Sequence, residues 1–307
     1  MHPAPSIIIF TVASGLGYGL AVMLGLGLLQ PSAAATKIAH VLALALIGGG
    51  LLSSTLHLGN PQRAWRALSQ WRSSWLSREG VMALATFVPL AISAGMALFD
   101  DSYSPPLGLV GAAMAVATVY CTAMIYASLR TVEAWHTALT PACYIAFSLA
   151  GGALLATLFA ALGGADARLP GVAALLLLAV AWAAKRAWKR RMAALVSSST
   201  PETATGLGAI GRVRLLERPH MTENYLTREM GFKVARRHAA KLWRIAVLLG
   251  GLLPALALAI LLLQGQGGPL GIAAAALACI AYVLGLLVER WLFFAEARHA
   301  VMNYYGG

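Results

Sequence analysis

The sequence predicts an all-α integral membrane protein with eight transmembrane helices, and three observations lead to this fold class. Hydrophobic residues make up 59% of the 307 residues, charged residues make up only 11%, and the mean hydropathy is +0.74. Charge-free runs long enough to cross a bilayer recur along the whole chain. These runs are rich in Ala, Leu and Gly, and they lack the polar–apolar alternation that a membrane β-barrel requires.

The eight runs predict a single membrane domain over residues 1–307. In chain order, the expected helices cover residues 6–29, 38–56, 80–99, 107–129, 141–164, 169–186, 243–263 and 270–290. The sixth run is short, and we expect Lys185 and Arg186 to reach the water at its end by snorkelling. A short echo links WLSREG (75–80) and YLTREMG (225–231), and a match of this length is better explained by chance than by an internal repeat. We favour two four-helix bundles side by side.

Turn-forming and capping residues separate the runs. Residues 100–106 and 264–269 are short and rich in Gly, Pro, Asp or Ser, which is typical of turns. Thr140 followed by Pro141 is typical of an N-cap and a first helical residue, so it marks the start of the fifth helix. Residues 59–61, Gly-Asn-Pro, indicate a turn that ends the second helix.

The basic residues predict the orientation of the chain in the membrane. Of the 23 Lys and Arg residues, only Lys37 and Arg168 fall in loops on the side opposite the termini. The positive-inside rule therefore predicts a multi-pass protein of the bacterial inner (cytoplasmic) membrane with both termini in the cytoplasm. The net charge of +12 reflects topology and docking, so no nucleic-acid partner is expected.

The long basic loop over residues 187–241 is the exception among short connections. A loop longer than its connection requires is usually functional or disordered. We expect this cytoplasmic loop to be a docking surface for a partner protein. The alternative is a solvated polybasic segment beside anionic membrane lipid.

The cysteines and histidines argue against a metal held by this chain. The three cysteines are Cys121, Cys143 and Cys279. They fall in three different apolar runs with no C-x-x-C spacing, so they cannot hold an iron–sulfur cluster by the usual pattern. A b-type haem needs two histidines at matching depth. His40 and His57 lie at opposite faces of the membrane on one helix, and His57 and His136 both sit at loop edges, so haem b is not expected.

The connection between the second and third helices carries the candidate site. His57 closes the second run and Glu79 opens the third, with Arg63 among the arginines between them. A carboxyl half-buried in apolar surroundings can pass a proton, and ionisable groups within a membrane are functional by default. The alternatives are a structural histidine and a first-turn carboxyl that favours the helix dipole. The tryptophans of this connection, Trp65 included, are typical of an interfacial aromatic belt.

Several sequence motifs together resemble the membrane anchor subunits of the dimethyl sulfoxide reductase type. These are HLGNPQRA (57–64), LSRE (76–79), MIYASLR and WHTALTP (within 124–141), and the opening MHPA, FT and GYGL. The resemblance covers most of the chain and extends to the broader family of polysulfide and nitrite reductase membrane subunits.

The resemblance implies a role and a quinone site. Such a subunit holds a molybdenum catalytic subunit and an iron–sulfur subunit with four clusters at the membrane. It passes electrons between the clusters and quinone, either ubiquinone or menaquinone, and it carries no metal itself. The quinone-binding residues implied are His57, Gly59, Arg63 and Glu79, which keep the family motif. At the next position, where the family favours an aromatic residue, this sequence has Trp65, which departs in size but not in aromatic character and is also taken as quinone-binding. His57 would donate to a quinone carbonyl and Glu79 would deliver a proton, which makes these two the catalytic residues. Arg63 would stabilise negative charge on the ring oxygen or hold Glu79 in place.

The predicted orientation narrows the choice within the family. A cytoplasm-facing member is similar to the anchor of a membrane-bound sulfite dehydrogenase, which oxidises sulfite and reduces quinone. One alternative is the anchor of a dimethyl sulfoxide reductase-type enzyme that oxidises menaquinol. A secondary transporter is a second alternative, although transporters usually show paired broken helices and polar groups at mid-membrane. A purely structural anchor is a third.

Overall fold

The computed structural model describes residues 3–55, 60–197, 199–217, 222, 230, 234–264 and 268–305. Within these residues the regular structure is helical, and eight helices are long and apolar enough to cross a membrane. They are α1 (Pro5–Gly25), α2 (Ala34–Thr55), α3 (Trp75–Phe99), α4 (Pro105–Ala127), α5 (Leu139–Leu162), α6 (Arg168–Ala193), the continuous helix His238–Gln264, and α11 (Pro269–Ala295). The predicted fold class and the number of spanning helices are confirmed.

The seventh spanning helix combines three elements. These are α9 (Val234–Val247), the π-helical turn η2 (Leu248–Leu252) and α10 (Leu253–Gln264). Among the described residues, three short elements lie outside the spanning helices: η1 (Pro61–Gln70), α7 (Pro201–Thr205) and η3 (Ala300–Tyr305).

Several helix ends differ from the sequence prediction because hydropathy marks the apolar core and not the end of a helix. The seventh spanning helix already includes His238, before residue 243, and α11 continues to Ala295, beyond residue 290. Two further ends have a local explanation. The helix α3 begins at Trp75, before residue 80, because the Ser74 side chain caps it by accepting from the Ser77 N–H group. The helix α6 continues to Ala193, beyond residue 186, because Lys and Arg are good helix formers.

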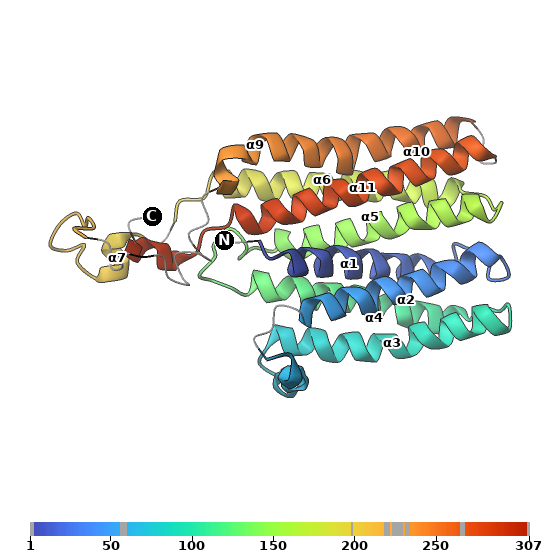
Figure 1. Ribbon diagram of the computed structural model, residues 1–307, viewed down its shortest axis with the longest axis horizontal. Coiled ribbons are helices and arrows are strands. Elements are labelled where there is room, and N and C mark those ends of the chain that lie inside the picture. Colours follow the sequence, from blue (N-terminus) through green and yellow to red (C-terminus); the bar gives the residue numbers. More distant parts are fainter. Residues whose placement is uncertain are drawn as a thin grey trace.

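The helix α1 lies at the centre of the bundle and packs against α2, α4, α5 and α11. Contacts link the helices α1, α2, α3 and α4 into one group. Contacts also link α5, α6, α10 and α11 into a second group. The direct packing of α1 on α5 joins the two groups, so the division into two separate bundles stays a prediction. Figure 1 shows the spanning helices side by side, with both chain ends, α7 and η1 toward one end of the bundle.

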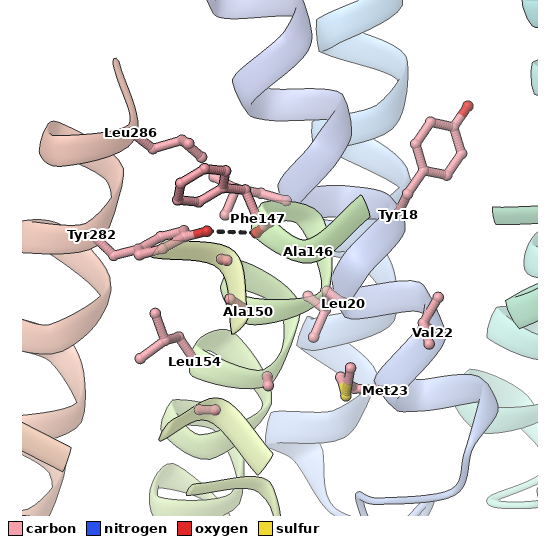
Figure 2. Close-up of a cluster of buried hydrophobic side chains, with 14 of the residues drawn as sticks. Tyr18, Leu20, Val22, Met23, Ala146, Phe147, Ala150, Leu154, Tyr282 and Leu286 are labelled. Atoms are coloured by element: carbon pink, nitrogen blue, oxygen red, sulfur yellow. Dashed lines mark hydrogen bonds between the residues drawn. The ribbon is translucent and has the colours of Figure 1, made fainter. Parts of the chain in front are cut away.

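Small residues allow α1 and α5 to approach closely. A Cβ atom added at Gly152 would overlap the backbone of Gly19, so both positions require glycine. The Ser148 hydroxyl donates to the Gly15 carbonyl across the same contact at 2.6 Å. Figure 2 shows the neighbouring core, where the Tyr282 hydroxyl of α11 donates to the Phe147 carbonyl of α5 at 2.5 Å.

Candidate functional site

The connection between α2 and α3 folds as the 3-10 helix η1, with Pro61 in its first turn. It lies against the start of α3. The Ser77 hydroxyl donates to the Ala67 carbonyl, and the Gln70 N–H group donates to the Ser77 oxygen at 3.0 Å. The Arg78 guanidinium donates to two carbonyls of the same connection. The connection is therefore fixed over the beginning of α3, at the end of the bundle where the termini lie.

The structure separates the predicted site residues by exposure. Glu79 is only 5% exposed, whereas Trp65 is 66% exposed and Arg63 is also exposed. Among the described residues, Arg63 makes no ion pair with Glu79. The predicted residues His57 and Gly59 lie outside the described residues. The structure therefore places Glu79 inside the bundle, and Arg63 and Trp65 on the surface of η1 above it.

Glu79 does not lie where the sequence places it relative to its helix. Because α3 begins at Trp75, Glu79 lies about one turn inside the helix, and the first turn of α3 holds no acidic residue. The alternative of a first-turn carboxyl that stabilises the helix dipole is therefore wrong. Burying a carboxyl at this depth costs free energy unless the carboxyl is hydrogen-bonded. An ionisable group buried inside a membrane bundle is typical of a functional site.

The partner of Glu79 is Thr122 of α4, a buried residue that the sequence analysis did not identify. The Thr122 hydroxyl oxygen lies 2.5 Å from Glu79 Oε1 and 3.1 Å from the Thr118 carbonyl. A hydroxyl has one proton to donate, so it can donate to only one of them at a time. Thr122 donates to Glu79 when the carboxyl is ionised. When the carboxyl is protonated, it can donate to Thr122, which then donates to Thr118. Both protonation states of Glu79 are therefore satisfied.

A small cavity lies on the other side of Thr122. It encloses about 10 Å³ and is bordered by Thr122, Tyr144, Ser148 and Arg290, among others. The Tyr144 hydroxyl and the Arg290 Nε atom are buried and have no hydrogen-bond partner among the described residues. The cavity has about the volume that one water molecule needs, and its polar groups could bind that water. Thr122, which contacts Glu79, therefore also borders a cavity that reaches Arg290.

Arg290 belongs to a buried triad of charges with Lys185 and Glu289. Glu289 Oε1 lies 2.6 Å from Lys185 Nζ, and Glu289 Oε2 lies 3.1 Å from Arg290. All three side chains are at most 3% exposed. The Lys185 ammonium lies 3.8 Å from the ring centre of Trp188, and the Arg290 guanidinium lies 3.8 Å from that of Tyr144. Two cations on one carboxylate leave the triad with one net positive charge, which aromatic faces help to stabilise.

The triad corrects one sequence prediction. Lys185 does not snorkel to water. It lies in the core because Glu289 of α11 provides its counter-charge. Glu289 and Arg290 are neighbours on α11, whereas Lys185 comes from α6. A lysine and a glutamate within predicted spans were the available signal, because such groups usually pair with one another.

The described residues do not assemble a metal site. Among them, no three His, Cys, Asp or Glu side chains lie close enough to hold a metal ion. His136 is exposed, and its Nδ1 atom lies 2.7 Å from the Ala127 carbonyl. Its suggested haem partner, His57, is outside the described residues, so that pairing is not tested.

Comparison with known proteins places the chain in a family of membrane anchor subunits. Residues 1–295 match the family described as DMSO reductase anchor subunit (DmsC). The protein is 34% identical to a subunit of the sulfite dehydrogenase of Allochromatium vinosum, over 99% of both proteins. It is 31% identical to a subunit of the anaerobic dimethyl sulfoxide reductase of Escherichia coli, over 52% of this protein and 58% of that one.

Proposed function

Because this chain belongs to the family of DMSO reductase anchor subunits, we propose that it is the quinone-binding anchor of a molybdenum and iron–sulfur oxidoreductase. It passes electrons between the iron–sulfur subunit and the quinone pool. Because the chain belongs to this family, we set aside the alternative that it is a secondary transporter. The observation that carries the quinone site is the buried Glu79–Thr122 pair beneath the basic, aromatic surface of η1.

The direction we favour is quinone reduction coupled to sulfite oxidation. The relative that matches the whole chain is a sulfite dehydrogenase subunit, whereas the dimethyl sulfoxide reductase subunit matches about half of it. The excess of Lys and Arg at the end that carries both termini supports a cytoplasmic location for that end and for the partner subunits. Dimethyl sulfoxide reduction with menaquinol is the second candidate, supported by the shorter match.

The residues of the site fit a quinone head group. A quinone accepts two electrons and two protons and presents two carbonyl oxygens as hydrogen-bond acceptors. The cavity beside Thr122 is too small for the ring, at about 10 Å³. We place the ring at the lipid-facing edge near η1, where Trp65 offers an aromatic face and Arg63 a cation. The donor expected from the sequence is His57, which lies outside the described residues.

Within this proposal, Glu79 supplies one of the two protons, and the other comes from the water at the same end of the bundle. The Glu79 carboxyl is protonated from the water at the nearby end of the bundle, and it donates that proton at the reduced ring oxygen. Thr122 keeps the carboxyl hydrogen-bonded before and after the transfer and so holds its position. Arg63 stabilises negative charge on the ring oxygen from the η1 side.

The test is the variant Glu79→Gln in the native complex. A general acid typically contributes about 10²–10⁴-fold, so sulfite-dependent quinone reduction should fall at least about 100-fold. Sulfite oxidation with an artificial electron acceptor should not change, because that reaction bypasses the anchor. Unchanged quinone reduction would contradict the role of Glu79.

Asp101→Asn is the matched control. Like Glu79→Gln, this variant replaces a carboxyl with an amide. Asp101, however, follows the other end of α3 and pairs with Lys37 near the surface. Its backbone has φ of 50°, a conformation that Asn tolerates. This variant should keep wild-type quinone reduction.

Co-purification tests the anchor function separately. A molybdenum subunit and an iron–sulfur subunit should accompany the tagged chain, and purification without them would refute the anchor function.

A further inference from the structure

Side chains of α6 and α9 line a groove. The adjoining ends of these two helices lie at the end of the bundle that carries the termini (Figure 1). The groove encloses about 590 Å³, which lies within the range of about 300–1,000 Å³ that is usual for small-molecule sites. Its principal lining residues are Trp182, Arg186, Lys189, Arg190, Trp243 and Val247. The groove is separate from Glu79, which lies on α3.

The groove is basic at its rim and apolar in its depth. Arg186 and Arg190 are one helical turn apart on α6, and both are exposed. Neither makes an ion pair with another described residue. Trp182 lies one turn deeper on α6, and Val247 lies deeper on α9. The two arginines are therefore free to bind an anion at the membrane surface, above apolar side chains.

The third cation of the rim is already positioned. Lys189 lies 3.6 Å from the Glu296 carboxylate and 4.3 Å from the ring centre of Trp243. The Glu296 charge offsets Lys189, so the positive charge available to a ligand is that of Arg186 and Arg190. Among the described residues, no acidic side chain lines the groove itself.

The apolar wall of the groove is held in a fixed orientation. The Trp182 indole N–H group donates to the Gly250 carbonyl at 2.8 Å, and its ring meets Trp243 edge to face at 5.8 Å. Gly250 belongs to the π-helical turn η2, and such turns are frequent at functional sites. A Cβ atom added at Gly251 would lie 2.9 Å from Trp182 Nε1. Position 251 therefore requires glycine if the indole is to fit against the turn.

We propose that this groove is a binding site for one anionic phospholipid. The phosphate of the headgroup lies between Arg186 and Arg190, and an acyl chain follows the apolar wall formed by Trp182 and Val247. Basic pockets between transmembrane helices at the membrane surface suit anionic lipid headgroups. A free phosphate ion would use only the rim, whereas a phospholipid also uses the apolar depth of the groove.

The first test is native mass spectrometry of the full-length protein purified in mild detergent. The wild type should retain phosphatidylglycerol or cardiolipin. The double variant Arg186→Gln/Arg190→Gln should bind phosphatidylglycerol roughly 30-fold more weakly, which corresponds to about 1 kcal/mol for each cation near an anionic surface. Equal retention of anionic lipid by the wild type and this variant would overturn the proposal.

The matched control is Arg212→Gln/Arg214→Gln. It removes the same charge from two exposed arginines outside the spanning helices, so lipid retention should equal that of the wild type. Loss of lipid from both double variants would reduce the effect to overall charge and refute a specific site.

A thermal-shift measurement distinguishes the source of the phosphate. Phosphatidylglycerol should raise the melting temperature of the delipidated wild type, while phosphatidylcholine and inorganic phosphate should not. An equal shift with inorganic phosphate would overturn the lipid assignment, because it would show an anion site alone. An equal shift with phosphatidylcholine would overturn the role of the arginines in selecting the ligand.

Discussion

Glu289→Gln should destabilise the protein strongly, and more than Lys185→Met, because Glu289 is the only acid in the buried triad. With Glu289 neutral, Lys185 and Arg290 remain as two uncompensated cations in the core, where each is at most 3% exposed. Removing one partner of a buried ion pair costs about 3–5 kcal/mol, and here a single substitution removes the partner of two cations. We therefore expect a loss at or above the upper end of that range.

Lys185→Met has a different charge balance. It leaves Glu289 paired with Arg290 at 3.1 Å, so the net charge of the cluster falls from +1 to zero and no buried ion is left alone. Methionine also fits beside the Trp188 ring that Lys185 contacts. The cost should therefore stay below the range of about 3–5 kcal/mol for a broken pair.

The assay is the free energy of unfolding in mixed micelles, compared among the wild type and the two variants. Glu296→Gln is the control, because Glu296 pairs with Lys189 at 3.6 Å near the surface. This pair is only partly buried, so its loss should cost less than that of the buried triad; exposed pairs contribute about 1 kcal/mol or less. Equal losses for Lys185→Met and Glu289→Gln would refute the charge-balance argument.

Three further contacts in the bundle can be tested by substitution, two of them with a matched control. Thr122→Val should slow quinone reduction by about 10-fold or more, since a hydrogen bond to a charged group contributes about 1.5–3 kcal/mol, whereas Thr122→Ser should keep it. If Thr122→Val reduced quinone at the wild-type rate, the Thr122 hydroxyl would have no part in the proton transfer by Glu79. Gly152→Ala should lower the free energy of unfolding by about 1–3 kcal/mol or more by forcing α1 and α5 apart; Gly49→Ala, which has open space, should be neutral. Tyr282→Phe should cost about 1 kcal/mol in the same assay through its lost hydrogen bond, and no loss would mean that this bond adds nothing to stability.

The fold was predictable from hydropathy because each spanning helix is a local property of the chain. The extension of α6 to Ala193 was not, because a hydropathy window stops at the first charged residues even where the helix continues. The same applies to the start of α3, where Ser74 caps the helix in a segment too polar to count as part of a span.

The candidate site was predictable only in part. Glu79 stood out as a carboxyl beside an apolar run, and the structure shows it buried. Its partner Thr122 was not predictable, because a threonine in an apolar helix gives no signal until α3 and α4 are packed together. The position of Lys185 was misjudged for the same reason, since a lysine at a helix end looks free to reach water until its acid on α11 is known.

The central position of α1 bears on how the protein is made. Synthesis delivers α1 to the membrane before any of the helices that enclose it, although 78% of its most apolar stretch is buried in the finished bundle. Two of its polar residues suit this early exposure to lipid. The Thr11 and Ser14 hydroxyls donate to the carbonyls of Ile7 and Phe10 within the same helix, so they need no partner from elsewhere. The first helix can therefore wait in the bilayer at little cost until the later helices arrive and assemble around it.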